Sequence, residues 1–320
     1  MSALLEIDDL RVTFGGTAAV RGISLTVEKG ETHCLVGESG CGKSVTSLAV
    51  MGLLAKGGKR EAARLSFAGE DIRDYDEKRM SRLRGDRMAM IFQEPMTSLN
   101  PAYTVGSQMT EVLRRHRGTP RAQAVDRAVE LLTRVGITAP GLRLGQFPHQ
   151  LSGGLRQRVM IAMALMCDPE LLIADEPTTA LDVTVQAQIL RLLAELQKDL
   201  GLGILLITHD LGIVARVADR VSVMYAGKVV EEGPVGALMA GPLHPYAKGL
   251  LGATVHAGMR GKRLTTIPGA PPMLDKVPEG CAFAPRCAEV IDGCQTGVPA
   301  LRQISPGRQA RCIRLTPAGG

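Results

Sequence analysis

One short stretch decides the fold of this 320-residue chain: Gly37-Glu38-Ser39-Gly40-Cys41-Gly42-Lys43-Ser44. It follows an apolar segment, residues 32–36, and it precedes residues 44–54, whose apolar side chains recur at helical spacing. Between a strand and a helix, such glycines let backbone N–H groups surround phosphate oxygens, while the lysine reaches the β- and γ-phosphates and the serine hydroxyl binds Mg²⁺. A chance glycine turn would lack this flanking strand and helix. We therefore predict that residues 37–45, ending at Val45, bind ATP.

Strand and helix patterns alternate on both sides of this loop. Residues 4–12 alternate apolar and polar side chains, as half-buried strands do. Residues 171–174 and 204–207 are short apolar runs typical of buried parallel strands. Helical periodicity covers residues 105–136 and 155–167. This alternation predicts an α/β fold.

Charge and composition change near residue 241. The chain has 38 basic and 32 acidic residues, a net charge of +6, and the whole excess falls within residues 241–320. The same segment holds ten of the 18 prolines and four of the seven cysteines. We therefore expect a domain of residues 1–240 followed by a C-terminal extension, residues 241–320.

Several classes of protein are disfavoured by composition. No apolar stretch approaches the roughly 18 residues of a spanning helix. The first ten residues include Glu6, Asp8 and Asp9, unlike a signal peptide, so a cytoplasmic location is expected. Aromatic residues make up 3% of the chain and tryptophan is absent, which disfavours stacking on nucleic-acid bases. No nucleic-acid partner is expected.

Two carboxylates end the apolar run of residues 171–174: Asp175 and Glu176. A buried strand gains no stability from paired charges at its tip, although Pro177 would also suit an ordinary turn. We predict that Asp175 holds Mg²⁺ and that Glu176 acts as the general base on the attacking water. His209 follows the other apolar run, and a histidine in that position, taken alone, is more often structural than catalytic.

The segment Leu151-Ser-Gly-Gly-Leu-Arg-Gln-Arg158 resembles the signature motif of ATP-binding cassette (ABC) ATPases, although an N-cap would explain the serine alone. Other residues resemble further motifs of that family in the expected order. They are the adenine-stacking aromatic (Phe14), the Q-loop glutamine (Gln93), the D-loop (Ala180-Leu181-Asp182) and the switch histidine (His209).

This resemblance implies a fold and an assembly. The fold is a RecA-like P-loop NTPase core with an N-terminal antiparallel β subdomain and a helical subdomain at about residues 95–165. Ser44, Gln93 and Asp175 would hold Mg²⁺. The assembly is a head-to-tail ATPase dimer, in which Ser152, Gly153, Gly154 and Arg156 of one subunit contact ATP bound to the other.

The chain is most similar to ATPase subunits of dipeptide and oligopeptide importers. The similarity includes Gln93-Glu-Pro-Met-Thr-Ser-Leu-Asn-Pro101, Pro242-Leu-His-Pro-Tyr246 and Cys281-Ala-Phe-Ala-Pro-Arg-Cys287. It implies a second ATPase subunit, identical or different, two permeases and an extracytoplasmic binding protein, with this chain peripheral on the cytoplasmic face of the inner membrane. Nickel-chelate, opine or glutathione cargo is an alternative to peptides. A soluble ABC ATPase that uses its basic tail on nucleic acid or ribosomes is the alternative from another class.

Four cysteines lie in the extension: Cys281, Cys287, Cys294 and Cys312. Their spacing lacks the tight Cys-x-x-Cys pairs of zinc ribbons, and disulfides are disfavoured in the cytosol. The resemblance to peptide importers implies a [4Fe-4S] cluster with these four thiolates as ligands. Zinc and unliganded thiols remain alternatives.

Overall fold

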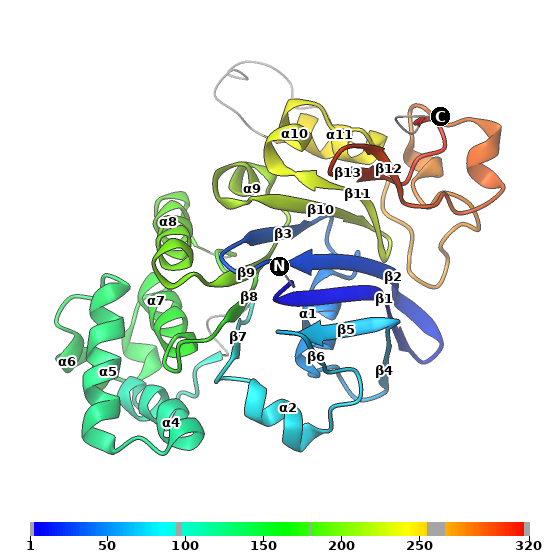
Figure 1. Ribbon diagram of the computed structural model, residues 1–320. Coiled ribbons are helices and arrows are strands. Elements are labelled where there is room, and N and C mark those ends of the chain that lie inside the picture. The colour runs from blue at the N-terminus through cyan, green and yellow to red at the C-terminus, as the bar shows by residue number, and fades with distance from the viewer. Residues whose placement is uncertain (1–2, 94–97, 180, 255–265, 317–320) are drawn as a thin grey trace. The chain divides into compact units, whose positions relative to one another are not determined.

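The computed structural model describes residues 3–93, 98–179, 181–254 and 266–316 (Figure 1). Glu94, which follows the predicted Q-loop glutamine, and Ala180, the first residue of the predicted D-loop, lie outside these ranges. The chain divides into two compact units. Unit 1 comprises residues 1–27, 31–73 and 207–320, and unit 2 comprises residues 28–30 and 74–206.

Unit 1 contains an antiparallel sheet near the N-terminus (blue to cyan in Figure 1), as expected for the β subdomain. Its strands are β1 (Leu5–Phe14), β2 (Thr17–Val27), β4 (Gly58–Glu61), β5 (Arg64–Phe67) and β6 (Glu70–Asp71). The order is β2-β1-β5-β6, and β4 also pairs with β1. Leu5, Ile7, Leu10 and Val12 of β1 are buried, so the alternation in the sequence gives the sheet one apolar face.

A second group of strands in unit 1 carries the phosphate-loop segment. The fully buried β3 (Thr32–Val36) pairs in parallel with β10 (Arg220–Tyr225), which pairs antiparallel with β11 (Lys228–Pro234). After β3 the chain turns through residues 37–42 into α1 (Lys43–Met51), which ends at Gly52. Three short helices complete this part of unit 1: α9 (Leu211–Val217), α10 (Val235–Ala240) and α11 (Pro245–Gly252).

Unit 2 combines buried parallel strands with helices. β7 (Met88–Ile91) pairs in parallel with β8 (Leu171–Asp175), and β9 (Gly203–Thr208) is the next strand in the order. The region 105–136 contains two helices, since Gly118 ends the first and Pro120 precedes the second. The helices of this unit are α2 (Glu77–Leu83), α4 (Val105–Arg117), α5 (Arg121–Arg134), α6 (Pro140–Leu144), the 3₁₀ turn Pro148–Gln150, α7 (Gly153–Ala164) and α8 (Val183–Leu200).

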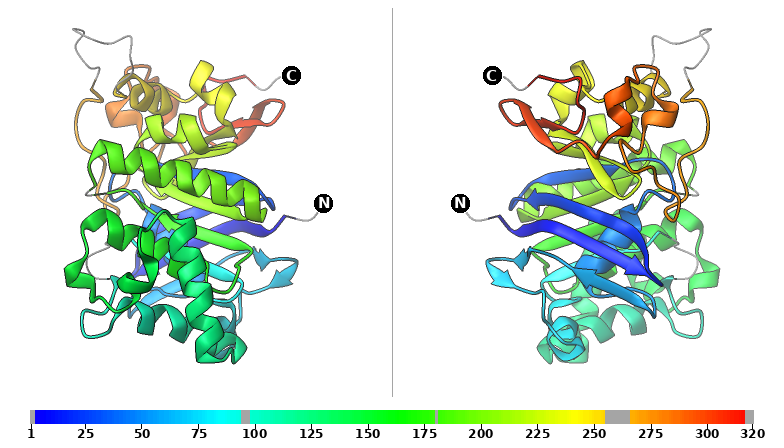
Figure 2. Two further views of the ribbon diagram at one scale, coloured as in Figure 1. Left: turned by 90° about the vertical axis from the view of Figure 1, so that its left-hand side faces the viewer. Right: turned by 90° about the vertical axis from the view of Figure 1, so that its right-hand side faces the viewer.

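The C-terminal extension joins the sheet of unit 1. Two short strands, β12 (Arg302–Ser305) and β13 (Arg308–Ala310), form a hairpin, and β13 pairs with β11 through Glu231 and Ala310. Apart from α11 and 3₁₀ turns at Ala284–Arg286 and Asp292–Gln295, the other described residues of the extension are irregular. Figure 2 shows these orange and red residues beside α11 and β11 from two sides. The described parts of the chain contain no helix with the length and hydropathy of a membrane span.

The stability of the protein should depend on pH through His244, which lies just before α11. Its side chain is 1% exposed, and its Nδ1 accepts a hydrogen bond from the Tyr246 N–H at 3.0 Å. Burial lowers the pKa of His244 to about 4, so the unfolded chain binds a proton between pH 6.5 and 4 that the folded chain excludes. Acidification through this window therefore favours unfolding.

We expect the His244→Asn variant to lose less stability than the wild type between pH 7 and pH 5, by about 2 kcal/mol. Asparagine keeps a side-chain acceptor for the helix N-terminus and does not titrate. Urea unfolding at the two pH values measures the difference. An equal loss in both proteins would contradict the assignment.

Candidate nucleotide-binding site

The phosphate loop requires glycine at two positions because backbone and side-chain atoms approach closely there. A Cβ atom at Gly37 would lie 2.2 Å from the Met224 carbonyl oxygen. At Gly42 it would lie 2.6 Å from the Ala19 carbonyl oxygen, and Gly42 also has a φ of +105°. A side chain at either position would therefore clash with backbone, whereas Ser39 and Gly40 are exposed at the tip of the loop.

Lys43 is held inside this loop. Its side chain is buried, and its Nζ donates hydrogen bonds to the Gly37 carbonyl at 2.8 Å and to the Glu38 carbonyl at 3.0 Å. Burial raises the pKa of the neighbouring Cys41 thiol, which therefore stays neutral. Ser44 and Val45 follow in the first turn of α1 and are half-buried. The loop thus places an ammonium group beneath exposed backbone, an arrangement suited to phosphate.

Two other predicted nucleotide residues belong to unit 1. Phe14 ends β1 opposite Thr17 and Gly58, and its ring is half-buried. His209 is exposed between β9 and α9. The next residue, Asp210, caps α9 by accepting from the Gly212 N–H at 2.7 Å. His209 is thus presented at the surface by a capped turn.

In unit 2 the structure brings together two residues predicted from separate motifs. Gln93 Nε2 donates to Glu176 Oε2 at 3.3 Å, although 83 residues separate them. Asp175, the last residue of β8, is 4% exposed. Glu176 has a φ of +45°, an unusual backbone conformation of the kind that concentrates at functional sites.

Sequence reasoning missed Thr179, whose hydroxyl also donates to Glu176 Oε2, at 2.8 Å. The available signal was its position three residues after Glu176, in the turn that Pro177 begins. Thr179 fixes one carboxylate oxygen of the predicted base and thereby orients the other.

The predicted signature residues stand at the start of α7. Ser152 is the N-cap and its hydroxyl accepts from the Leu155 N–H at 3.4 Å, so the N-cap interpretation is correct as local structure. Gly153 and Gly154 form the first turn, where a Cβ on Gly154 would lie 3.0 Å from Val185. Arg156 Nε donates to the carbonyls of the preceding loop at Pro148 and Leu151.

Asp182 caps α8 in the same way. Its Oδ1 accepts from the N–H groups of Thr184 and Val185 at 3.0 and 2.9 Å. The predicted D-loop aspartate therefore has a structural role within its own unit, and this role leaves its second carboxylate oxygen for other contacts.

The four tail cysteines line one small cavity together with His244 and Phe283. All four are free thiols, and burial raises the pKa of Cys281 and of Cys287. Among the residues that the structure describes, no three His, Cys, Asp or Glu side chains are arranged to hold a metal ion. The four cysteines therefore line the same cavity, as the predicted cluster requires. The described residues do not, however, place them as a set of metal ligands.

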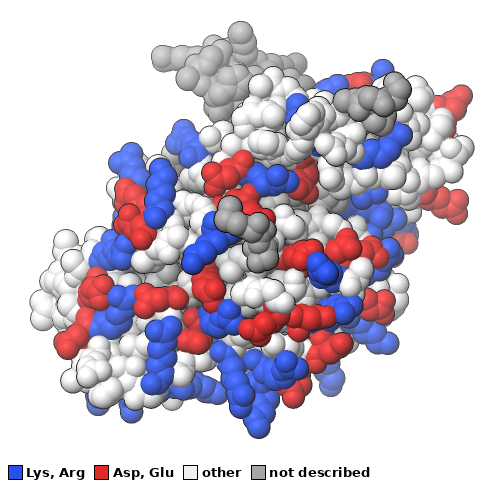
Figure 3. Space-filling view, in the orientation of Figure 1, with Lys and Arg blue, Asp and Glu red and all other residues white. Residues whose placement is uncertain are grey.

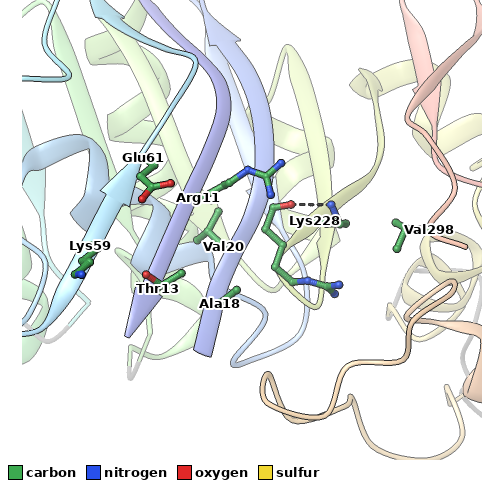
Figure 4. Close-up of a pocket in the computed structure, with 9 residues that line it drawn as sticks. Arg11, Thr13, Ala18, Val20, Lys59, Glu61, Lys228 and Val298 are labelled. Atoms are coloured by element: carbon green, nitrogen blue, oxygen red, sulfur yellow. Dashed lines mark hydrogen bonds between the residues drawn. The ribbon is translucent and has the colours of Figure 1, made fainter. Parts of the chain in front are cut away.

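A second cavity in unit 1, of about 300 Å³, lies along β1, β2 and β4 and contains none of the predicted nucleotide residues (Figure 4). Lys228 Nζ donates there to the Arg21 carbonyl at 2.7 Å, and burial with nearby arginines lowers the pKa of Lys228 to about 8. Sequence reasoning did not find this basic cavity. Its lining consists of Arg11, Thr13, Ala18, Val20, Arg21, Lys59, Glu61, Lys228 and Val298.

Comparison with known families and folds agrees with this geometry. The ABC transporter family model matches residues 20–179, and the model of the oligopeptide/dipeptide transporter C-terminal region matches residues 230–294. The structure resembles cbiO1 of Clostridium perfringens, part of the ABC transporter complex cbiONQ, with a TM-score of 0.66, 31% identity and coverage of 75% of this chain and 92% of that one. It also resembles the ATP-binding cassette MJ0796, solved as a post-hydrolysis dimer with ADP and Pi, with a TM-score of 0.65, 26% identity and coverage of 72% and 98%.

Relatives match the chain over nearly its whole length. The dipeptide transport ATP-binding protein DppD of Escherichia coli is 50% identical over 97% of this chain and 96% of its own. The oligopeptide transport ATP-binding protein OppD of Salmonella typhimurium is 48% identical over 98% and 94%, respectively. AppD, the oligopeptide transport ATP-binding protein of Bacillus subtilis, is 49% identical over 100% and 99%. The chain therefore belongs to the ABC transporter family, as an ATP-binding subunit of the peptide, dipeptide and oligopeptide importer branch.

Proposed function

We propose that this chain binds and hydrolyses ATP to power the import of dipeptides or oligopeptides through partner permeases. The observation that carries the proposal is the full-length similarity to peptide transport ATP-binding proteins, which extends through the C-terminal region at residues 230–294. The family model that matches this region describes the C-terminal region of oligopeptide and dipeptide transporters. The phosphate loop alone indicates only a nucleotide-binding protein.

The roles of the site residues follow from their chemistry. The phosphate loop binds the nucleotide phosphates through backbone N–H groups and Lys43, and Phe14 stacks on adenine. Ser44, Gln93 and Asp175 would hold Mg²⁺, which when bound offsets phosphate charge. Glu176, oriented by Thr179, accepts a proton from the attacking water. His209 assists beside the γ-phosphate.

We further propose that two ATPase subunits act head to tail. Ser152, Gly153 and Gly154 open α7, and the N–H groups and dipole of a helix N-terminus favour an anion. In the dimer they and Arg156 would contact ATP bound to the other subunit, and Asp182 would lie at the junction. ATP closes the dimer, the segment around Gln93 transmits closure to the permeases, and hydrolysis resets the pair.

The complete importer would contain a second ATPase subunit, identical or different, two permeases and an extracytoplasmic binding protein. This chain would sit peripherally on the cytoplasmic face of the inner membrane. Residues 1–240 would form the ATPase domain, with a helical subdomain near residues 95–165, and residues 241–320 its extension. These assignments rest on membership of the importer branch.

Uptake by cells that lack the gene distinguishes peptides from the other cargo classes. Loss of labelled di- and tripeptide uptake, with uptake of nickel chelates, opines and glutathione unchanged, is the result expected for a peptide importer. Loss confined to one of those other cargoes would assign the chain to that transporter instead.

We also propose that the four tail cysteines bind a [4Fe-4S] cluster, supported by the cavity they share. Binding would require the thiols to lose protons and to close around the cavity. Chain purified anaerobically should then be brown, absorb near 400 nm and contain about four iron atoms. Cys294→Ser should lower the iron content, whereas Cys167→Ser, which changes a buried cysteine in the turn that follows α7, should not. Colourless protein that contains zinc or no metal would rule the cluster out.

A further inference from the structure

The C-terminal extension contacts the phosphate loop through an ion pair between Arg286 and Glu38. Arg286 and Glu38 are 248 residues apart, yet Arg286 Nη1 donates to Glu38 Oε2 at 2.6 Å and Nη2 donates to Oε1 at 2.9 Å. The side chains are 6% and 27% exposed. Two parallel charge-assisted hydrogen bonds with this little solvent are the strong form of an arginine–carboxylate contact.

Arg286 is itself fixed by the extension. Its Nε donates to the Pro268 carbonyl at 2.9 Å, and Nη1 also donates to the Tyr225 hydroxyl at 3.3 Å. It ends the 3₁₀ turn Ala284–Arg286 and directly precedes Cys287. The bond to Glu38 raises the pKa of Arg286 further, so the guanidinium remains charged. Loss of the extension's fold would therefore release the phosphate loop.

A second contact holds the backbone of the same glutamate. The Glu38 N–H donates to the Tyr246 hydroxyl at 2.9 Å. Tyr246 is fully buried, and its ring lies 4.6 Å from the Tyr225 ring and 5.3 Å from the Phe283 ring, centroid to centroid. Burial raises the pKa of Tyr246, which keeps the hydroxyl protonated. Glu38 is thus held at its carboxylate by Arg286 and at its amide by Tyr246.

Glu38 in turn positions the lysine of the loop, because its carbonyl accepts from Lys43 Nζ at 3.0 Å. The Glu38 carboxylate also affects ATP binding directly, through its negative charge. A negative side chain in a loop that binds a polyanion opposes binding by Coulomb repulsion unless a cation neutralises it. Arg286 is that cation.

We propose that Arg286 and Tyr246 are positioning residues for ATP, through which the cysteine-rich extension sets the geometry and the charge of the phosphate loop. Neither residue needs to touch the nucleotide. The extension then acts as a structural part of the ATP site, and any change that unfolds the segment around Cys281 and Cys287 weakens nucleotide binding.

The test is a double-mutant cycle on the full-length chain, read out as the Kd for ATP and the kcat and KM of hydrolysis. Arg286→Met should raise Kd and KM about tenfold and leave kcat within about twofold. Glu38→Gln should raise the Kd for ATP less than about threefold, because it removes the repulsive charge together with the ion pair. The double variant should have the same Kd for ATP as Glu38→Gln. This Kd should be lower than that of Arg286→Met alone by about threefold or more.

Two further variants separate positioning from general loss of stability. Tyr246→Phe keeps the ring packing, removes the acceptor for the Glu38 N–H and should raise Kd about threefold. Arg308→Met breaks another ion pair of the extension, to Glu231 at 3.0 Å, and should leave Kd within about twofold. Arg286→Lys serves if Arg286→Met does not fold, and it should fall between wild type and Arg286→Met.

An unchanged Kd in the Arg286 variants would overturn the proposal. So would a double variant that binds ATP as weakly as Arg286→Met or more weakly, or an Arg308→Met variant weakened to the same extent. Each of these results would leave the assignment of the chain as an ATPase intact.

Discussion

Replacing Glu176 by glutamine should slow ATP hydrolysis by roughly 100- to 10,000-fold and leave ATP binding intact. Glutamine has nearly the same size and can still accept from the Thr179 hydroxyl, so the turn after β8 should persist. It cannot accept the proton of the attacking water. Phosphate release under saturating ATP, measured beside nucleotide retention, gives both quantities in one preparation.

Glu170→Gln is the matched control. Glu170 directly precedes β8 and pairs with Arg87 at 2.6 Å, so this change also neutralises a carboxylate at one end of the same strand. Turnover should stay within about twofold of wild type, because a partly exposed ion pair away from the predicted base contributes little. Full hydrolysis by the Glu176 variant would show that another group activates the water.

Replacing Lys43 by alanine should weaken ATP binding about 100-fold or more, equivalent to roughly 3 kcal/mol. The ammonium group is buried within the loop and is fixed by the Gly37 and Glu38 carbonyls. Alanine removes this charge and leaves both carbonyls without the bond from Nζ. Titration with a fluorescent ATP analogue measures the loss.

Lys198→Ala provides the corresponding control, since Lys198 is exposed in the last turn of α8. Its removal should leave ATP affinity within about twofold of wild type, because screened surface charges act weakly. Equal affinity in the Lys43 and Lys198 variants would contradict the assignment of residues 37–44 as the phosphate loop.

Local patterns predicted the features that depend on neighbouring residues. The buried β3, the glycine loop and α1 follow one another within residues 32–51, and each has its own sequence signal. The acidic tip of β8 was predictable for the same reason. Contacts between distant segments were not, because nothing near Gln93 indicates that it reaches Glu176, and nothing near Cys287 indicates that Arg286 reaches Glu38.

The structure also changes the meaning of the basic extension. Its excess charge left a polyanionic partner as an alternative, yet several arginines of the extension make contacts inside unit 1. Arg308 pairs with Glu231, Arg314 with Glu289, and Arg311 donates to the Val229 and Pro299 carbonyls. On the face shown in Figure 3, many of the basic side chains have acidic side chains beside them. Net charge counted along the sequence does not reveal such pairing.

Peptide uptake by cells that lack this gene shows whether ATP hydrolysis by this chain powers import. Such cells, supplied with the wild-type gene, should recover uptake of a labelled tripeptide, and cells supplied with the Glu176→Gln variant at equal abundance should not. Uptake that persists without the gene, or that the Glu176→Gln variant fully restores, would show that ATP hydrolysis by this chain does not power peptide import.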